Sequence, residues 1–348
     1  MIESSLQQSE SVSLPPIRPF GRVVRSVAGY GVATALMMVS PLLVFVPAAL
    51  FHCALRNGRK AVWAAAAIAV GLVGLYFLQA AASSTGDASR NMAYASFAFL
   101  VLSIAIPSIA AVPLVERAEK FGHVLVFALA GSAIGLGVLE LTMRLSASFS
   151  PYAVQLAKAQ QNAASVVEMY RNANAGPEFV GTAQRLMQYG LAVLPAGILI
   201  DLCLIFVLSL MMFGRLKAWR GMAQTGTAAV EASRVYLFRN FALPEWLVFG
   251  FILGGLTPLT SGTFQRVAAN VLAIVIFLYM LQGLAVIRFA LVRAGAGVFG
   301  TVLAFSILAM LSVAGIGLLL IALVGLFDPF FDFRHLKRKD DLHEGHTD

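Results

Sequence analysis

Charged residues are scarce in this chain of 348 residues, of which Asp, Glu, Lys and Arg together make up 12%. Soluble proteins carry about 25% charged residues. Hydrophobic residues make up 59%, and the mean hydropathy is +0.83, so a water-soluble fold is excluded. We therefore expect an all-α, polytopic integral membrane bundle, because helices satisfy their own backbone hydrogen bonds inside a bilayer.

Cysteine is also scarce: the chain has two, Cys53 and Cys203, and both lie in apolar runs. A disulfide framework needs more cysteines in wetter segments, so we interpret both as buried hydrophobic residues. The sequence has no His-Glu-x-x-His, no phosphate-binding Gly/Lys loop and no nucleophile elbow. These missing motifs predict a protein that is not an enzyme and has no cofactor and no metal.

Basic residues exceed acidic ones, with a net charge of +8, but they lie in short clusters without a stripe of interleaved aromatics. This pattern predicts the lipid bilayer as the surroundings and excludes nucleic acid as a partner.

Eight apolar runs follow one another, at about 26–55, 61–82, 93–115, 122–145, 187–213, 243–260, 267–287 and 297–327. Most have the length of ~20 residues that one helix needs to cross a bilayer. The first and last are too long for one crossing and too short for two, and they are interrupted by Pro41, Pro47 and the Gly315–Gly317 segment. We predict that each forms a hairpin of two short helices, which gives about 8–10 membrane segments.

The positions of Lys and Arg support this topology. With both end runs folded back, 19 of the 25 basic residues lie on one side, as expected for the cytoplasmic side of a bacterial inner membrane. The N-terminus is then cytoplasmic. For 297–327, one long tilted helix with an outside tail is the alternative.

The predicted organisation has a polar cytoplasmic tail at 1–25, a membrane domain at 26–334 and a charged tail at 335–348. Within the membrane domain, 146–186 is expected to be an extracytoplasmic helical insertion that serves as a cap or a lid. The basic cytoplasmic loop at 214–242 is either an interfacial elbow or a docking segment for a partner.

Asp201 is the main candidate functional residue, because it is the one ionisable side chain in the run 187–213. The run places it near the middle of the bilayer, where a charged residue costs roughly 2.5–3.5 kcal/mol and usually faces a bundle interior or a wet cavity. We predict that neighbouring helices enclose Asp201 and that it binds a ligand or a proton. A structural carboxylate bonded to another helix is the alternative.

Three other polar residues are weaker candidates. Glu140 and Arg144 are four residues apart with the acid first, which favours an ion pair. This pair is either local or a substrate contact. Gln282 is suited to a hydrogen bond between helices, or to a ligand contact. The spacing of Gly131 and Gly135 predicts close helix packing and allows a homo-oligomer.

Four stretches together resemble the YybS-like family of predicted bacterial membrane proteins, whose function is uncharacterised. They are Pro41…Pro47 with Leu55-Arg56-Asn57-Gly58, then Leu243-Pro244-Glu245-Trp246, then Leu281-Gln282-Gly283-Leu284-Ala285, and finally Gly325-Leu326-Phe327-Asp328 with Phe331-Asp332-Phe333-Arg334. The resemblance covers most of residues 35–335 and implies a membrane fold.

More distantly, the Pro-rich first hairpin and the basic-Gly turn after it are similar to the S components of energy-coupling-factor transporters. That resemblance implies small-molecule uptake with an ATPase or membrane partner subunit. The first helix has Gly29 and Ala33 where those components have paired alanines. The same broad group includes the cell-shape protein MreD, which implies a scaffold.

Two functions therefore remain open at the level of sequence. The first is a small-molecule transporter or substrate-binding membrane component with Asp201 in its cavity. The alternative is a non-transporting membrane scaffold for envelope or cell-shape proteins.

Overall fold

The computed structural model describes residues 20–173, 176–215, 235–312 and 316–334. All regular elements in these ranges are helices. Five of the helices are long and apolar enough to cross a membrane: Arg59–Ala82, Asp87–Glu116, Phe121–Ala147, Leu194–Phe213 and Gly262–Arg293. Shorter apolar helices occupy Pro41–Asn57, Leu247–Leu259, Val298–Met310 and Gly317–Phe331. The predicted all-α membrane bundle is confirmed.

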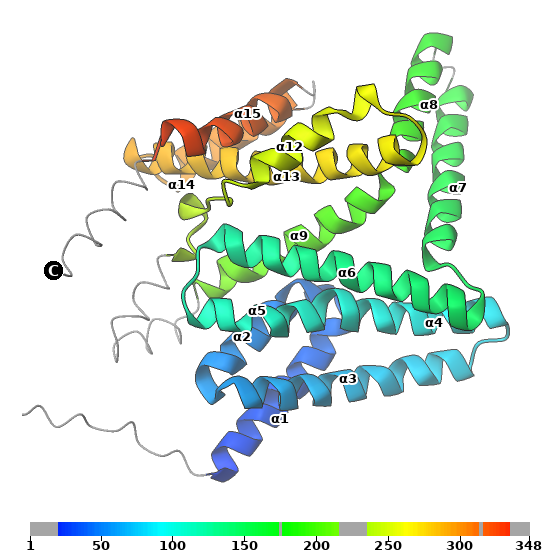
Figure 1. Ribbon diagram of the computed structural model, residues 1–348, viewed down its shortest axis with the longest axis vertical. Helices are drawn as coiled ribbons and strands as arrows, with labels where there is room; N and C mark the ends of the chain where they lie inside the picture. The colour runs from blue at the N-terminus through cyan, green and yellow to red at the C-terminus, as the bar shows by residue number, and fades with distance from the viewer. Residues whose placement is uncertain (1–19, 174–175, 216–234, 313–315, 335–348) are drawn as a thin grey trace, which may run out of the picture.

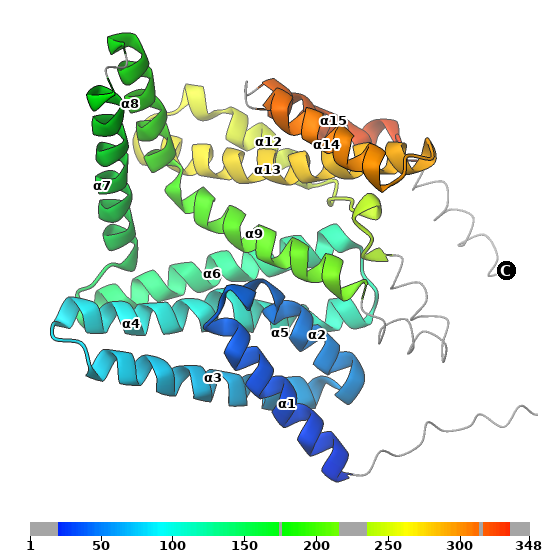
Figure 2. The same cartoon turned by 180° about the vertical axis from the view of Figure 1, so that it is seen from behind.

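The helices form two groups with one helix between them (Figures 1 and 2). The first group comprises α1 (Phe20–Met38), α2 (Val46–Asn57), α3 (Arg59–Ala82), α4 (Asp87–Leu100), α5 (Ile106–Glu116) and α6 (Phe121–Ala147). The second comprises α12 (Leu247–Gly255), α13 (Gly262–Arg293), α14 (Val298–Ser312) and α15 (Ile316–Phe331). Helix α9 (Leu194–Phe213) crosses between the groups and contacts α2 and α6 on one side and α13 on the other.

Two ends of the bundle differ in character. Helix α7 (Pro151–Asn172) runs across the ends of the long helices with α8 (Pro177–Ala192) beside it, and we call this the arm end (Figure 1). The start of α1, the α2–α3, α5–α6 and α13–α14 turns, and the ends of α9 and α15 all lie at the opposite end. We call that the basic end, because Arg59, Lys60, Arg117 and Lys120 belong to those turns.

Both long apolar runs fold as the predicted hairpins. In 26–55, α1 is followed by a short 3-10 helix, η1 (Pro41–Phe45), and α2 returns to the basic end. Ser209 of α9 supports this break, since its hydroxyl accepts a hydrogen bond from Ala48 N (3.4 Å) and donates one to Val44 O. In 297–327, α14 and α15 are separate helices in contact, so the alternative of one long tilted helix is wrong.

Helices α4 and α5 are joined by one π turn, Val101–Ala105. This turn leaves one backbone carbonyl without a helical partner, and a side chain of α6 donates a hydrogen bond to it. Pro107 has no N–H, so the carbonyl of Ser103 lacks its helical donor. The hydroxyl of Ser132 donates to that carbonyl over 2.7 Å. A Cβ at Gly135 would lie 2.2 Å from the carbonyl oxygen of Leu102, so this glycine allows the close packing that the sequence predicts.

The apolar run 187–213 is not one helix, which corrects the predicted depth of Asp201. Helix α8 ends at Ala192, and α9 begins at Leu194 with Pro195 in its first turn. Asp201 therefore lies seven residues into α9, about 10 Å along its axis, and nearer to the arm end. The prediction failed because the first residues of the run belong to the arm and not to the crossing helix.

Candidate functional site

Asp201 lies on an exposed face of α9. The exposed side chains after it are Leu204 (39% exposed), Leu208 (47%) and Met212 (37%), which follow at spacings of three and four residues. Residues at these spacings share one side of a helix. The opposite side of α9 is buried in the hydrophobic core and includes Leu202, Cys203, Phe206 and Leu210.

The prediction that other helices enclose Asp201 is therefore wrong. Asp201 is exposed, and within the described part of the chain its carboxylate has no hydrogen bond or ion pair. A side chain on an exposed face of a crossing helix meets whatever surrounds the protein. The structure thus places the Asp201 carboxylate on the surface of the described residues, and its role in binding a ligand or proton stays a prediction.

Glu140 and Arg144 form a local pair that holds the start of the arm. Arg144 Nε donates to Glu140 Oε1 over 2.6 Å. The other carboxylate oxygen accepts from the backbone N–H of Tyr152 (3.1 Å) in the first turn of α7. Ser150, the N-cap of α7, donates to Glu140 and accepts from Ala153 N (3.0 Å). This geometry favours the local alternative, since the carboxylate caps a helix whose first N–H groups need acceptors.

Replacing Glu140 by alanine is expected to loosen the start of α7. The variant loses a charge-assisted cap, which is worth about 1–2 kcal/mol and corresponds to roughly 5- to 30-fold faster local opening. Hydrogen exchange at the amides of Tyr152 and Ala153 measures this opening directly. Glu168→Ala is the matched control, because Glu168 pairs with Arg171 on the exposed surface of the same helix. Equal exchange rates in the two variants would contradict the capping role.

Gln282 belongs to a buried polar network at the basic end. The side chain is 1% exposed. Its Oε1 accepts from Leu243 N, and its Nε2 donates to Asp328 Oδ2, each over 3.0 Å. The amide thus bonds protein groups on both sides, and the geometry favours the predicted helix-to-helix role over a ligand contact.

Arg334 completes this network. Its Nη2 and Nε bond the two carboxylate oxygens of Asp328, the second over 3.3 Å. Its Nη1 donates to the carbonyls of Arg239 (3.0 Å) and Phe241 (2.8 Å). Asp328 is 5% exposed and Arg334 is 2% exposed. We call Gln282, Asp328 and Arg334, with the carbonyls and N–H that they bond, the clamp.

The segment held by the clamp also packs into an aromatic cluster of the first helix group. Phe121 of α6 lies edge-on to Phe241 (ring centroids 5.1 Å apart) and to Tyr236 (6.0 Å), and Tyr236 also contacts Phe213 at the end of α9. Burial raises the pKa of Tyr236, and the negative charge of Glu119 raises it further, so the phenol stays neutral. Residues 236–243 therefore connect the two helix groups at the basic end.

The local sequence around Asp328 and Arg334 does not predict that these two residues are buried and paired. Both follow the last apolar run, where an acid and a base six residues apart look like ordinary surface residues. Three of the four stretches quoted for the family resemblance, at 243–246, 281–285 and 325–334, contribute to the clamp. The family resemblance rests on these stretches together, which was the available signal. The structure shows that they meet in the clamp.

A family of predicted membrane proteins (DUF2232) matches residues 32–329, which is most of the chain. The chain belongs to this family. No curated protein and no solved structure gives a match. The narrower resemblances, to YybS-like proteins, to S components and to MreD, stay predictions.

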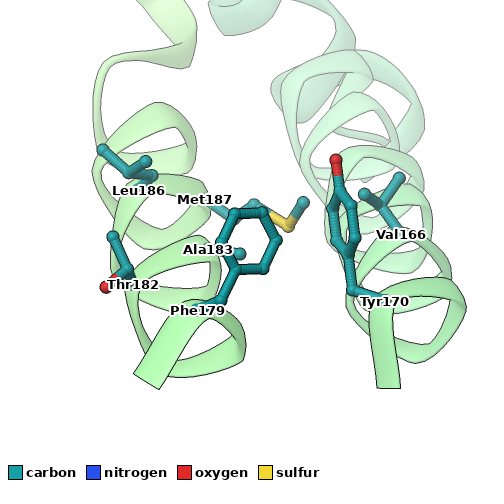
Figure 3. A pocket seen from close by; sticks show the side chains of 7 residues that line it. All are labelled: Val166, Tyr170, Phe179, Thr182, Ala183, Leu186 and Met187. Atoms are coloured by element: carbon teal, nitrogen blue, oxygen red, sulfur yellow. The ribbon is translucent and has the colours of Figure 1, made fainter. Parts of the chain in front are cut away.

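The described residues also form an apolar groove in the arm, away from the sites above (Figure 3). It has a volume of about 350 Å³ and is lined by Val166, Tyr170, Phe179, Thr182, Ala183, Leu186 and Met187. Tyr170 of α7 and Phe179 of α8 meet edge to face, with ring centroids 5.1 Å apart. None of the predicted site residues lines this groove.

Proposed function

We propose that this integral membrane protein is a non-transporting scaffold that assembles envelope proteins around it. One observation carries the proposal: the polar residues expected to line a substrate cavity do not converge. Glu140 and Arg144 cap the arm, Gln282 is used by the clamp, and Asp201 faces outward from α9.

A carrier needs polar groups that face a common space and that change partners as the substrate passes. In this protein the buried polar groups of the clamp bond one another and the backbone, which favours a rigid frame. This comparison supports the scaffold over the transporter, in which Asp201 would contact a cationic or polar ligand.

The positive-inside rule supports a cytoplasmic basic end in a bacterial inner membrane. The loop 214–242 is then on the cytoplasmic side, and the clamp and the aromatic cluster hold Arg239 and Phe241 near its end. Residues 216–234, which include Lys217 and Arg220, lie outside the described residues. Arg215 is described and is exposed. We propose this loop as the docking segment for a cytoplasmic partner.

Charge reversal in the loop tests this proposal. Arg215→Glu with Lys217→Glu and Arg220→Glu is expected to lower the recovery of cross-linked partner about tenfold or more, because each reversal turns an attraction into a repulsion. Quantitative mass spectrometry of affinity-purified protein from the native membrane measures the loss.

The matched control reverses three basic residues of the arm, Lys158, Arg171 and Arg185, which gives the same change in net charge at the other end. Recovery of partner should be unchanged in that control. The scaffold proposal is overturned if both triple variants keep the full set of partners while the purified wild-type protein transports a solute into vesicles and Asp201→Asn abolishes that transport.

A further inference from the structure

The exposed face of α9 has a regular composition that suits another helix. Gly197, Asp201, Leu204, Leu208 and Met212 follow one another at spacings of four, three, four and four residues, and we call them the α9 face. A Cβ placed on Gly197 would meet nothing within 4 Å, so the space beside Asp201, one turn away, is open. A glycine one turn from the carboxylate leaves room for a long side chain to approach Asp201 along this otherwise apolar face.

The carboxylate of Asp201 has no partner among the residues that the structure describes. It lies within a helix of mean hydropathy 2.5, with apolar side chains along the same face. Intramembrane carboxylates are retained when they pair with a base or with hydrogen-bond donors. Because the described residues offer Asp201 no such group, a helix of another protein in the membrane is a suitable source of it.

A second copy of this chain does not provide it. A symmetric contact through the α9 face would bring two Asp201 side chains together, because an isologous interface pairs each patch with itself. Two neighbouring carboxylates disfavour each other's ionised form. A basic side chain is the complementary choice, and lysine or arginine has the length to reach Asp201 past Gly197.

We propose that the α9 face binds a transmembrane helix of a partner protein that carries a lysine or arginine at the depth of Asp201. This inference rests on the scaffold function proposed above and names the chemistry of one of its partners within the membrane. Leu204, Leu208 and Met212 supply the apolar contact, and the ion pair sets the register between the two helices.

A synthetic probe helix tests the proposal without knowledge of the partner. The probe is a 21-residue leucine helix with a single lysine seven residues from its arm-end terminus, and the reference probe has leucine at that position. The full-length protein carries a donor dye on a cysteine introduced at Gln160, which is exposed on α7. Energy transfer to an acceptor on the probe is measured in phosphatidylcholine vesicles.

The lysine probe is expected to bind the wild-type protein about 3- to 20-fold more tightly than the leucine probe, the range for polar contacts between membrane helices. Asp201→Leu should remove this difference while the unfolding temperature stays the same or rises. The matched control combines Asp201→Leu with Ile307→Asp, which moves the carboxylate to an exposed position of α14. That control should not restore preferential binding.

Each other outcome overturns the inference. Equal binding of the two probes, or a preference for the lysine probe that survives Asp201→Leu, contradicts the proposed ion pair. Self-association of the wild-type protein that depends on Asp201 makes a second copy the occupant instead. None of these results decides the scaffold function, which is judged separately by the charge reversals in the cytoplasmic loop.

Discussion

Replacing Arg334 by alanine is expected to destabilise the protein by about 3–5 kcal/mol, the usual result of breaking a buried ion pair by removing one partner. The substitution leaves the Asp328 carboxylate buried without its base and leaves the carbonyls of Arg239 and Phe241 without their donor. An unpaired buried charge costs more than the pair itself contributes, so the loss is larger than the strength of the ion pair alone would suggest.

Thermal unfolding in detergent measures this effect with a reporter that the chain already contains. Cys53 and Cys203 are both buried, so a thiol-reactive dye labels them only as the bundle opens. We expect the midpoint to fall by on the order of 5–10 °C. Arg171→Ala is the control, because Arg171 and Glu168 form an exposed pair that is worth less than about 0.5 kcal/mol. If Arg334→Ala and Arg171→Ala shift the midpoint equally, the clamp does not hold the fold together.

A second test exchanges the pair for apolar residues. Asp328→Leu with Arg334→Met removes both charges at once, and well-packed apolar replacements of a buried ion pair are often neutral. This double variant is therefore expected to recover much of the stability that Arg334→Ala loses. Its failure to recover would show that the hydrogen bonds from Arg334 to the carbonyls of Arg239 and Phe241 matter more than the charges.

Gly325→Val is the other substitution with a large expected effect. A Cβ at Gly325 would lie 1.9 Å from the carbonyl oxygen of Tyr279 and 2.6 Å from the backbone nitrogen of Gly283, so α13 and α15 would have to separate. These are backbone atoms within a helix and cannot move aside as a side chain does. Overpacking of this kind costs about 1–3 kcal/mol and occasionally more, and separation of the helices also stretches the Gln282–Asp328 hydrogen bond.

The same unfolding measurement reports this loss, and a glycine in open space provides the control. A Cβ at Gly137 of α6 would meet nothing within 4 Å. Gly137→Ala is therefore expected to be neutral or to stabilise by up to about 1 kcal/mol, since alanine is the better helix former. A Gly325→Val protein as stable as Gly137→Ala would contradict the close contact between α13 and α15.

Much of the fold followed from the order of apolar runs. The hairpins at 26–55 and 297–327 were predictable, because a run of about 30 residues broken by proline or glycine fits two short helices, and the basic residues fit the same topology. The boundary between α8 and α9 was not predictable in the same way. Residues 187–213 are continuously apolar, and only the turn of the chain into the arm shows where the crossing helix begins.

The polar sites were harder to predict than the helices. Glu140 and Arg144 are four residues apart in one helix, so their ion pair was predicted, but the bond from Tyr152 N that makes Glu140 a cap was not. In the clamp, Gln282 bonds a residue 46 positions later, and Arg334 bonds a carbonyl 93 positions earlier. No local pattern records partners at such separations.

The amino-acid sequence was enough to establish a helical protein embedded in a bilayer, since the thickness and dryness of the membrane constrain every segment separately. Which carboxylate is paired and which is exposed depended on how the helices pack together. A hydrogen bond or ion pair between helices is a property of two segments at once, so Asp328 proved to be enclosed and Asp201 to face outward, although both are acids in apolar surroundings.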